Sequence, residues 1–202
     1  MEDQQLVVDA LTAALAKSGM SQASFAAALG TSQPRLSTYI NGRVMPSAAL
    51  LVRAQRLSEA LQRLRRLHLW SPVNTASAIR QVLADNPASP ARKVEREALR
   101  ALLHGRDHLR LVLAEHPDLA LVWHARPRAT GRLEWDALLG AVTAHEFERA
   151  DRMAPSWSQQ THLAHSWVYP SALLSTSEVR AHTPAWLADR NLHIAERDLT
   201  TT

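Results

Sequence analysis

The stretch SQASFAAALGTSQPRLSTYINGR, residues 21–43, constrains the fold more than any other part of this chain. Ser21 and Ser32 are each suited to begin a helix, because an N-cap serine accepts a hydrogen bond from a backbone N–H of the first turn. Gly30 and Gly42 are suited to end one, because glycine readily adopts the left-handed conformation found at helix ends. The sequence therefore predicts two short helices that cross at a steep angle, separated only by Gly30 and Thr31.

The second of these helices is expected to bury one side and expose a polar one. Leu36 and Tyr39 fall on the apolar side, and Pro34 falls in the first turn, where its missing N–H costs nothing. The exposed positions are Gln33, Pro34, Arg35 and Thr38. This layout is typical of a helix-turn-helix, whose second helix presents polar side chains to base edges in the major groove of DNA.

Residues 19–57 resemble the Cro/lambda-repressor-like (XRE-type) helix-turn-helix family, and the helix expected before them extends the resemblance to about residues 5–69. The matching residues are Gly19-Met20-Ser21-Gln22, Phe25-Ala26, Leu29-Gly30, Ser32-Gln33, Leu36-Ser37, Asn41-Gly42-Arg43 and Pro46-Ser47, followed by the apolar helix from Leu50 to Leu57. The resemblance implies a five-helix domain that binds double-stranded DNA.

By position, the resemblance also implies two sets of DNA contacts. The residues expected to face bases are Gln33, Pro34, Arg35 and Thr38, and those expected to touch phosphates are Gln22, Ser32, Asn41 and Arg43. Members of the family usually have a polar residue where Pro34 stands and an acid where Ile40 stands. The side chain of Pro34 cannot hydrogen-bond a base, although it can pack on a thymine methyl group.

The distribution of charge supports a polyanionic partner for the same region. Residues 1–70 contain eight Lys and Arg against four acids, whereas residues 71–202 contain fifteen of each sign. All the excess positive charge therefore lies in the first third, and such asymmetry favours binding to nucleic acid.

The rest of the chain is expected to be mainly α-helical, because alanine and leucine are abundant and there are only six glycines. Segments 71–75 (SPVNT) and 86–90 (NPASP) are helix-breaking or capping in character, which predicts a DNA-binding domain at 1–70 and a mostly helical C-terminal domain at 71–202. Helices are expected at 5–18, at 47–69 (one helix or two with a bend), and at 76–84, 90–103, 106–115 and 132–150. A little β-structure is expected near the end, as a short strand at 166–169 and an extended segment at 191–194, with a helical turn from 184 between them.

Two further patterns each allow two interpretations. The stripe Leu50-Ala54-Leu57-Leu61-Leu64 has the spacing of a dimer seam and equally that of packing within one subunit. The tryptophans after residue 120 fit core packing or an aromatic-lined groove: Trp123, Trp135, Trp157, Trp167 and Trp186. The arginines of segment 47–69 can reach DNA backbone or simply solubilise a helix face: Arg53, Arg56, Arg63, Arg65 and Arg66.

Nothing in the sequence indicates an enzyme, a cofactor or a metal site. His104 and His108 can share a helix face, but no third ligand is suggested by spacing and the chain has no cysteine. Phosphate-binding glycine loops and nucleophile elbows are absent from the sequence. No run of 18 apolar residues exists, so a membrane span is not expected, and the lack of cysteine suits the cytoplasm.

The sequence therefore predicts a DNA-binding transcriptional regulator, acting as a homodimer and most often as a repressor. The C-terminal domain is expected to serve dimerisation, partner binding or sensing, and two alternatives follow. One is a small-molecule sensor with a pocket among the tryptophans, and the other is an antitoxin that neutralises a cognate toxin through its C-terminal domain and represses its own operon. That alternative rests on the segment from Pro155, above all Pro184–Ala188 and Asn191–Leu199, which resembles actinobacterial helix-turn-helix proteins encoded beside nucleotidyltransferase-type toxins.

Overall fold

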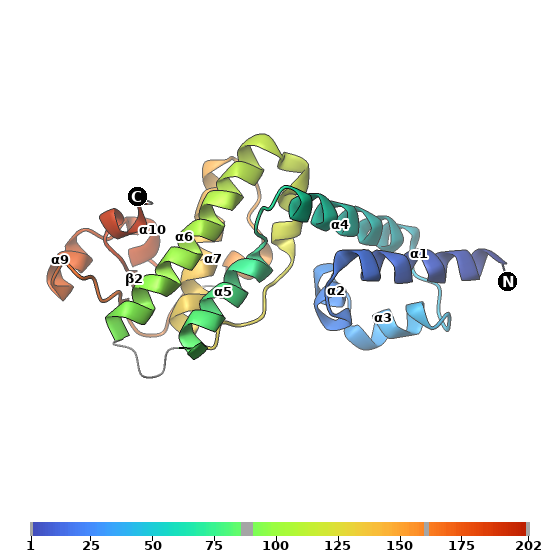
Figure 1. Ribbon diagram of the computed structural model, residues 1–202, viewed down its shortest axis with the longest axis horizontal. Helices are drawn as coiled ribbons and strands as arrows, with labels where there is room; N and C mark the ends of the chain where they lie inside the picture. The colour runs from blue at the N-terminus through green and yellow to red at the C-terminus, as the bar shows by residue number, and fades with distance from the viewer. Residues whose placement is uncertain (1, 86–90, 160–161, 201–202) are drawn as a thin grey trace.

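The N-terminal part of the protein is a bundle of four helices. The computed structural model describes residues 2–85, 91–159 and 162–200. The helices are α1 (Glu2–Ser18), α2 (Gln22–Ala28), α3 (Gln33–Ile40) and α4 (Ala48–Arg66), and α1 packs along α4 while α2 and α3 lie beneath α1 (Figure 1). Across residues 2–70, all of which are described, the expected fifth helix is absent, because segment 48–66 forms one continuous helix without a bend.

Serine and glycine set the boundaries of these helices, as expected. The side chains of Ser21, Ser32 and Ser47 each accept a hydrogen bond from the backbone N–H three residues later. Gly30 follows α2 with φ +72°, a conformation that a side chain would strain. The chain turns there within two residues, which fixes the steep crossing of α2 and α3.

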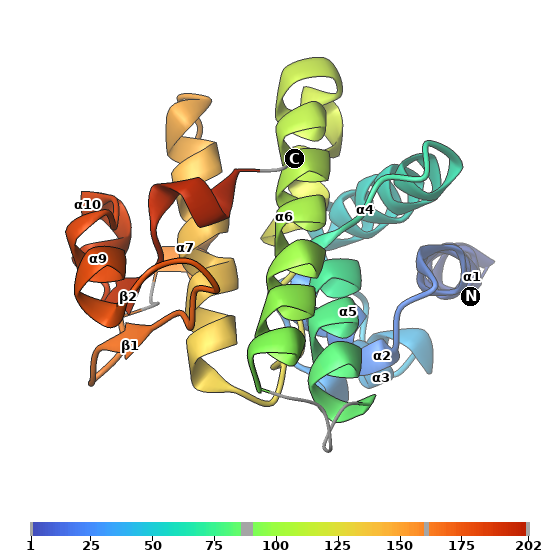
Figure 2. The ribbon, with the colours of Figure 1, turned by 60° about the vertical axis from the view of Figure 1, so that its left-hand side comes forward.

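Three long helices form the body of the C-terminal part: α5 (Pro72–Asp85), α6 (Ala91–Glu115) and α7 (Leu133–Arg149) (Figure 2). Segment 71–75 caps α5 as expected, with the Ser71 side chain accepting a hydrogen bond from the Asn74 N–H, but the helix begins at Pro72 and not at 76. The other expected breaker, 86–90, lies outside the described residues.

Helix α6 is a single helix, so the expected division into 90–103 and 106–115 is wrong. Gly105, in the middle of α6, marks a close helix crossing instead of a break. A Cβ atom at this position would lie 2.1 Å from the Thr75 hydroxyl oxygen of α5, so only glycine lets the two helices approach this closely.

The remaining elements are short. A 3₁₀ helix, η1 (Pro117–His124), lies between α6 and α7, and α8 (Ser156–Gln159) follows α7. Strands β1 (Trp167–Val168) and β2 (Leu192–His193) form a parallel pair, with α9 (Thr176–Ala181) and α10 (Ala185–Ala188) between them and η2 (Glu196–Leu199) after them. The strand expected at 166–169, the extended segment and the turn after 184 are thus confirmed, while η1, α8 and α9 were not expected.

Two clusters of buried apolar residues stabilise the fold, and the first crosses residue 70. It joins residues of α1–α4, such as Leu36 and Leu64, to Leu119 and Trp123 of η1 and to Phe147 of α7. The second cluster joins α5, α6 and α7 to β2 and its neighbours. The division into domains at residue 70 stays a prediction.

Within the described ranges, no helix has the length and apolarity required to cross a membrane.

Candidate nucleic-acid interface

Helix α3 is held in place by its apolar side, so that its other side faces outward. Leu36 is fully buried and Tyr39 nearly so, and both belong to the first hydrophobic cluster. The helix begins where the Ser32 hydroxyl accepts a hydrogen bond from the Arg35 N–H at 3.3 Å. It ends at Asn41, whose backbone N–H donates to the Ser37 carbonyl oxygen at 3.0 Å.

The four residues expected to face bases lie on this outward side or at its edge. Gln33, Pro34 and Arg35 are exposed, and Thr38 is half-buried. The Arg35 Nε donates a hydrogen bond to the Tyr39 hydroxyl at 2.7 Å, which draws the guanidinium along the helix, 6.0 Å from the centre of the Tyr39 ring. The Thr38 hydroxyl donates to the Arg35 carbonyl oxygen at 2.8 Å, so it is oriented and keeps its oxygen as an acceptor.

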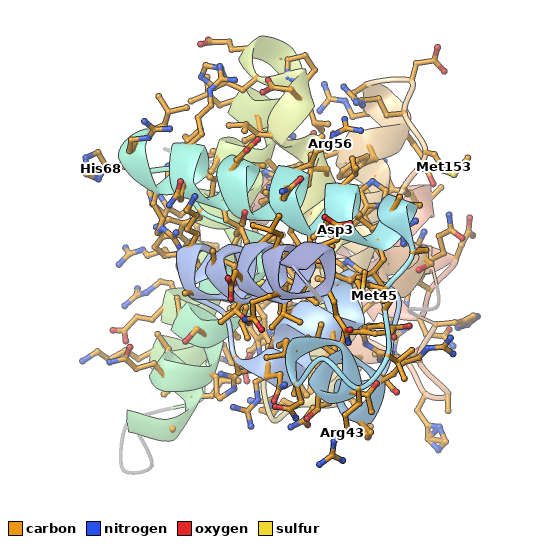
Figure 3. The ribbon with its side chains drawn as sticks, turned by 90° about the vertical axis from the view of Figure 1, so that its right-hand side faces the viewer. Asp3, Arg43, Met45, Arg56, His68 and Met153 are labelled. Carbon is orange, nitrogen blue, oxygen red and sulfur yellow. The ribbon has the colours of Figure 1, made fainter. Side chains whose placement is uncertain are left out.

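The four residues expected to touch phosphates surround α3. Ser32 and Asn41 are exposed at its two ends, Arg43 is exposed just beyond it, and Gln22 is half-buried at the start of α2. Arg43 projects from the lower edge of the molecule in Figure 3, away from α1 and α4. The Asn41 amide donates to the Ser37 hydroxyl at 3.3 Å, a weak bond that a phosphate oxygen can replace.

Three of the five arginines of α4 have partners inside the chain. Arg53 donates to the Leu29 carbonyl oxygen at 2.9 Å, and Arg65 donates to the carbonyl oxygens of Lys17 and Ser18. These carbonyls lie at the C-terminal ends of α2 and α1, where backbone acceptors lack partners in their own helix. Arg63 pairs with Asp118 of η1 at 2.6 Å. Sequence reasoning missed these roles, because the partners lie 24 to 55 residues away along the chain.

The leucine stripe of α4 is buried within the subunit. Leu57, Leu61 and Leu64 belong to the first hydrophobic cluster together with residues of α1 and η1. Of the two interpretations of the stripe, packing inside one subunit is therefore the one that the structure supports, and a dimer needs another surface.

The connection from α4 to α5 carries an aromatic cluster. The rings of Trp70 and His104 meet edge to face at 4.4 Å, and those of His104 and His108 lie 4.3 Å apart. The Trp70 backbone N–H donates to His108 Nδ1 at 2.9 Å. Burial, followed by the neighbouring His104, lowers the pKa of His108, while Asp107 acts in the opposite direction. Through residues 2–85, 91–159 and 162–200, no group of three or more His, Asp or Glu is placed to hold a metal ion.

The late tryptophans serve mainly as core residues, although two also line cavities. Trp123 and Trp135 are fully buried. Trp157 lines a cavity of about 320 Å³ beside the segment between η1 and α7. Trp186 lines one of about 400 Å³, where its ring stacks on His145 at 4.1 Å. Core packing is therefore the interpretation that the structure supports, and an aromatic-lined groove stays a prediction.

Comparison with known proteins identifies the first part of the chain. Residues 11–63 match the family model described as helix-turn-helix, of the XRE type, and this range includes α2, α3 and most of α4. Proteins of this family are DNA-binding regulators and are typically not enzymes. Searches among curated proteins and among solved structures found no match to the chain.

Proposed function

We propose that this chain, whose residues 11–63 form a helix-turn-helix domain, is a sequence-specific double-stranded DNA-binding repressor of transcription. The observation that carries the proposal is the outward side of α3. Gln33, Pro34 and Arg35 are exposed on it and Thr38 lies at its edge, on a helix that has a buried face and two capped ends. A rigid helix with outward donors and acceptors is what reading base edges in the major groove requires.

The individual roles follow from the chemistry of the side chains. Gln33 can pair with both the N6 and N7 atoms of adenine, and the Arg35 guanidinium with O6 and N7 of guanine. The Thr38 hydroxyl offers an acceptor to a base amino group, and Pro34 offers an apolar contact to a thymine methyl. Phosphate contacts from the remaining set then fix the register of α3 in the groove: Gln22, Ser32, Asn41 and Arg43.

The repressor is proposed to bind as a homodimer on two half-sites. A two-fold dimer places two copies of α3 in successive major grooves, about 34–36 Å apart. Because the stripe of α4 is buried in its own subunit, we assign the dimer contact to residues 71–202. A dimer that covers a promoter excludes the transcription machinery, which gives repression.

A second candidate function is that of an antitoxin, and one observation favours it. Leu133, Met153 and Leu173 expose most of their apolar side chains at separate places of the C-terminal part, and a protein partner would cover some of them. Co-expression with the product of an overlapping neighbouring gene tests this role. Formation of a stable complex that relieves growth arrest supports it, and growth arrest without complex formation speaks against it.

The experiment for the main proposal begins with a duplex selected by the full chain from a randomised library. Gln33→Ala and Thr38→Ala should each weaken binding to the selected duplex by about 1–3 kcal/mol and leave binding to unrelated duplexes nearly unchanged. Gln55→Ala and Thr12→Ala remove the same side chains from exposed positions on α4 and α1, and they serve as matched controls.

Two outcomes would contradict parts of the proposal separately. If both α3 variants bind the selected duplex as tightly as the wild type, α3 does not read the sequence. If light scattering gives a monomer in solution at micromolar concentration and a single chain bound to a duplex with two half-sites, the homodimer is wrong while the assignment of α3 stands.

A further inference from the structure

A second basic surface lies in the C-terminal part, at the end where α6 begins and where the segment between η1 and α7 turns. Four exposed cations mark this surface, which we call the basic edge: Arg92, Lys93, Arg126 and Arg128. None of the four forms an ion pair or a side-chain hydrogen bond with the described residues of the chain. Cations of this kind are available to a partner.

Three acidic side chains of the same end are held by partners within the chain. Glu95, which is only 5% exposed, accepts hydrogen bonds from Arg132 and from the Trp135 indole N–H. Glu134 pairs with Arg132, and Asp136 accepts a hydrogen bond from the Thr130 backbone N–H at 2.7 Å. These three carboxylates bind Arg132 and two N–H groups and do not pair with the basic edge, so its four cations outnumber Glu97, the acid of α6 that lies one turn from Lys93.

The segment that carries Arg126 and Arg128 is fixed to the helical body. Arg80 of α5 donates hydrogen bonds from Nε to the Ala129 carbonyl oxygen and from Nη2 to the Arg128 carbonyl oxygen, both at 2.9 Å. A cation on a fixed backbone loses less conformational freedom on binding than one on a mobile loop.

The basic edge is continuous with the helix-turn-helix. Ala125 lines a small cavity of about 120 Å³ together with Gly19 and Met20, so the residue before Arg126 lies against the turn from α1 to α2. Gln22, expected to touch phosphate, follows two residues after Met20. In Figures 1 and 2, α3 and the ends of α5 and α6 lie along the same lower edge of the molecule, and Figure 3 places Arg43 at that edge as well.

We propose that the basic edge binds the phosphate backbone of duplex DNA flanking the site that α3 reads. This inference rests on the proposed function, because it assigns the basic edge to the same duplex. Arg126 and Arg128 lie nearer to α2 and contact the near flank, and Arg92 and Lys93 contact the flank farther out. The contacts are independent of sequence and act through release of counterions, which makes them dependent on salt.

The test uses the full chain and two duplexes, which contain the selected site alone or the same site extended by about one helical turn, ~10 base pairs, on each side. The wild type should bind the extended duplex more tightly and with a steeper dependence on salt. Arg126→Ser/Arg128→Ser and Arg92→Ser/Lys93→Ser should each reduce that salt slope by about two units. Each should also weaken binding to the extended duplex about tenfold at about 200 mM salt, and leave binding to the short duplex unchanged.

The matched control is Arg152→Ser/Arg197→Ser, which removes two exposed arginines away from the basic edge. It should leave both duplexes unaffected. The inference is overturned if the wild type binds the extended duplex no more tightly than the short one, or if the edge variants still bind the extended duplex more tightly. It is also overturned if the edge variants weaken binding to the short duplex as much as binding to the extended one. If the wild type binds neither duplex, the proposed function itself fails. If the edge variants abolish self-association and leave the gain from the flanks intact, the surface contacts protein instead of DNA.

Discussion

The two parts of the molecule use their charged side chains differently. In α1–α4, arginines such as Arg53 and Arg65 complete the ends of neighbouring helices, and the acidic residues take almost no part. In the C-terminal part, cations gather around two buried carboxylates, Glu95 and Glu146, and Glu146 accepts a hydrogen bond from Arg110 at 2.6 Å. Positive charge therefore exceeds negative charge in the first part, whereas the second part has equal numbers of both signs.

The comparison weakens at the apolar core, which both parts share. Trp123 of η1 is 1% exposed and packs in the same cluster as Leu61 and Leu64 of α4. The N-terminal and C-terminal parts therefore differ in charge but share one hydrophobic cluster. Four predictions, ordered from the largest expected effect to the smallest, break or sharpen this contrast.

Trp123→Ala should lower the free energy of unfolding by about 3–5 kcal/mol, because it leaves a large cavity beneath α4. Urea unfolding of the full chain should show one transition, with α-helix content and tryptophan fluorescence lost together. Met153→Ala, at a position 83% exposed, should change stability by less than about 0.5 kcal/mol. Two separate transitions, with the first unaffected by the substitution at 123, would mean that the parts fold independently.

Gly105→Ala should destabilise the C-terminal part by about 1–3 kcal/mol, although alanine is the better helix former. The added Cβ would overlap the Thr75 side chain. The measurement is a double-mutant cycle with Thr75→Gly, in which the two changes together should cost less than the sum of their separate costs. Strict additivity would show that α5 and α6 are not limited by this contact.

Arg53→Ala and Arg43→Ala should separate structural arginines from DNA-binding ones. Arg53→Ala removes the hydrogen bond to the Leu29 carbonyl oxygen and should lower the free energy of unfolding by about 1 kcal/mol. This is a small value for a hydrogen bond from a charged donor, because Arg53 is exposed to solvent. Arg43→Ala should leave the unfolding curve unchanged, weaken binding to every duplex alike and reduce the salt slope by about one unit. Losses at Arg43 that depend on sequence would make it a base reader.

The smallest effect concerns pH. Because the pKa of His108 is lowered in the folded state, the unfolded chain binds more protons as the pH falls below about 6.5. The contribution of His108 to the free energy of unfolding is therefore fully present above the pKa of the unfolded chain. It is lost as the pH falls through the pKa of His108 in the folded state. In His108→Asn the amide oxygen can accept the Trp70 N–H without titrating, so unfolding midpoints between about pH 7.5 and 5.5 should vary less than in the wild type.

The control for pH is His165→Asn, which removes an exposed histidine after α8. It should reproduce the pH dependence of the wild type. If His108→Asn does so too, the other histidines with lowered pKa values carry the effect: His124, His145 and His193.

The same contrast explains how much could be predicted from the sequence. The ends of α2 and α3 depend on signals within a few residues, namely Ser21, Gly30 and Ser32, and were predicted closely. The need for glycine at position 105 depends on Thr75 of another helix, which no local pattern at Gly105 reveals. Helix α9 did carry a local signal, the capping box of Ser175 and Glu178, which was overlooked.

The candidate site divides along the same line. Which side of α3 faces outward follows from the spacing of its apolar residues, and the exposure of Gln33 and Arg35 agrees with it. The hydrogen bond from Arg35 to Tyr39 lies within one turn and could have been expected from i,i+4 spacing. The basic edge could not, because it joins segments more than thirty residues apart in the sequence.

The placement of η1 under α4 has a practical consequence for anyone who would retarget this protein to a new operator. A chimera that joins residues 1–70 to the C-terminal part of another protein would expose the apolar side of α4 that packs against Leu119 and Trp123. Under the proposed function a smaller change suffices: the outward positions of residues 33–40 are exchanged while Leu36 and Tyr39, which hold α3 in the core, are retained. The base-facing side chains proposed for α3 can be exchanged within that one helix, whereas the packing of α4 against η1 has to be kept whole.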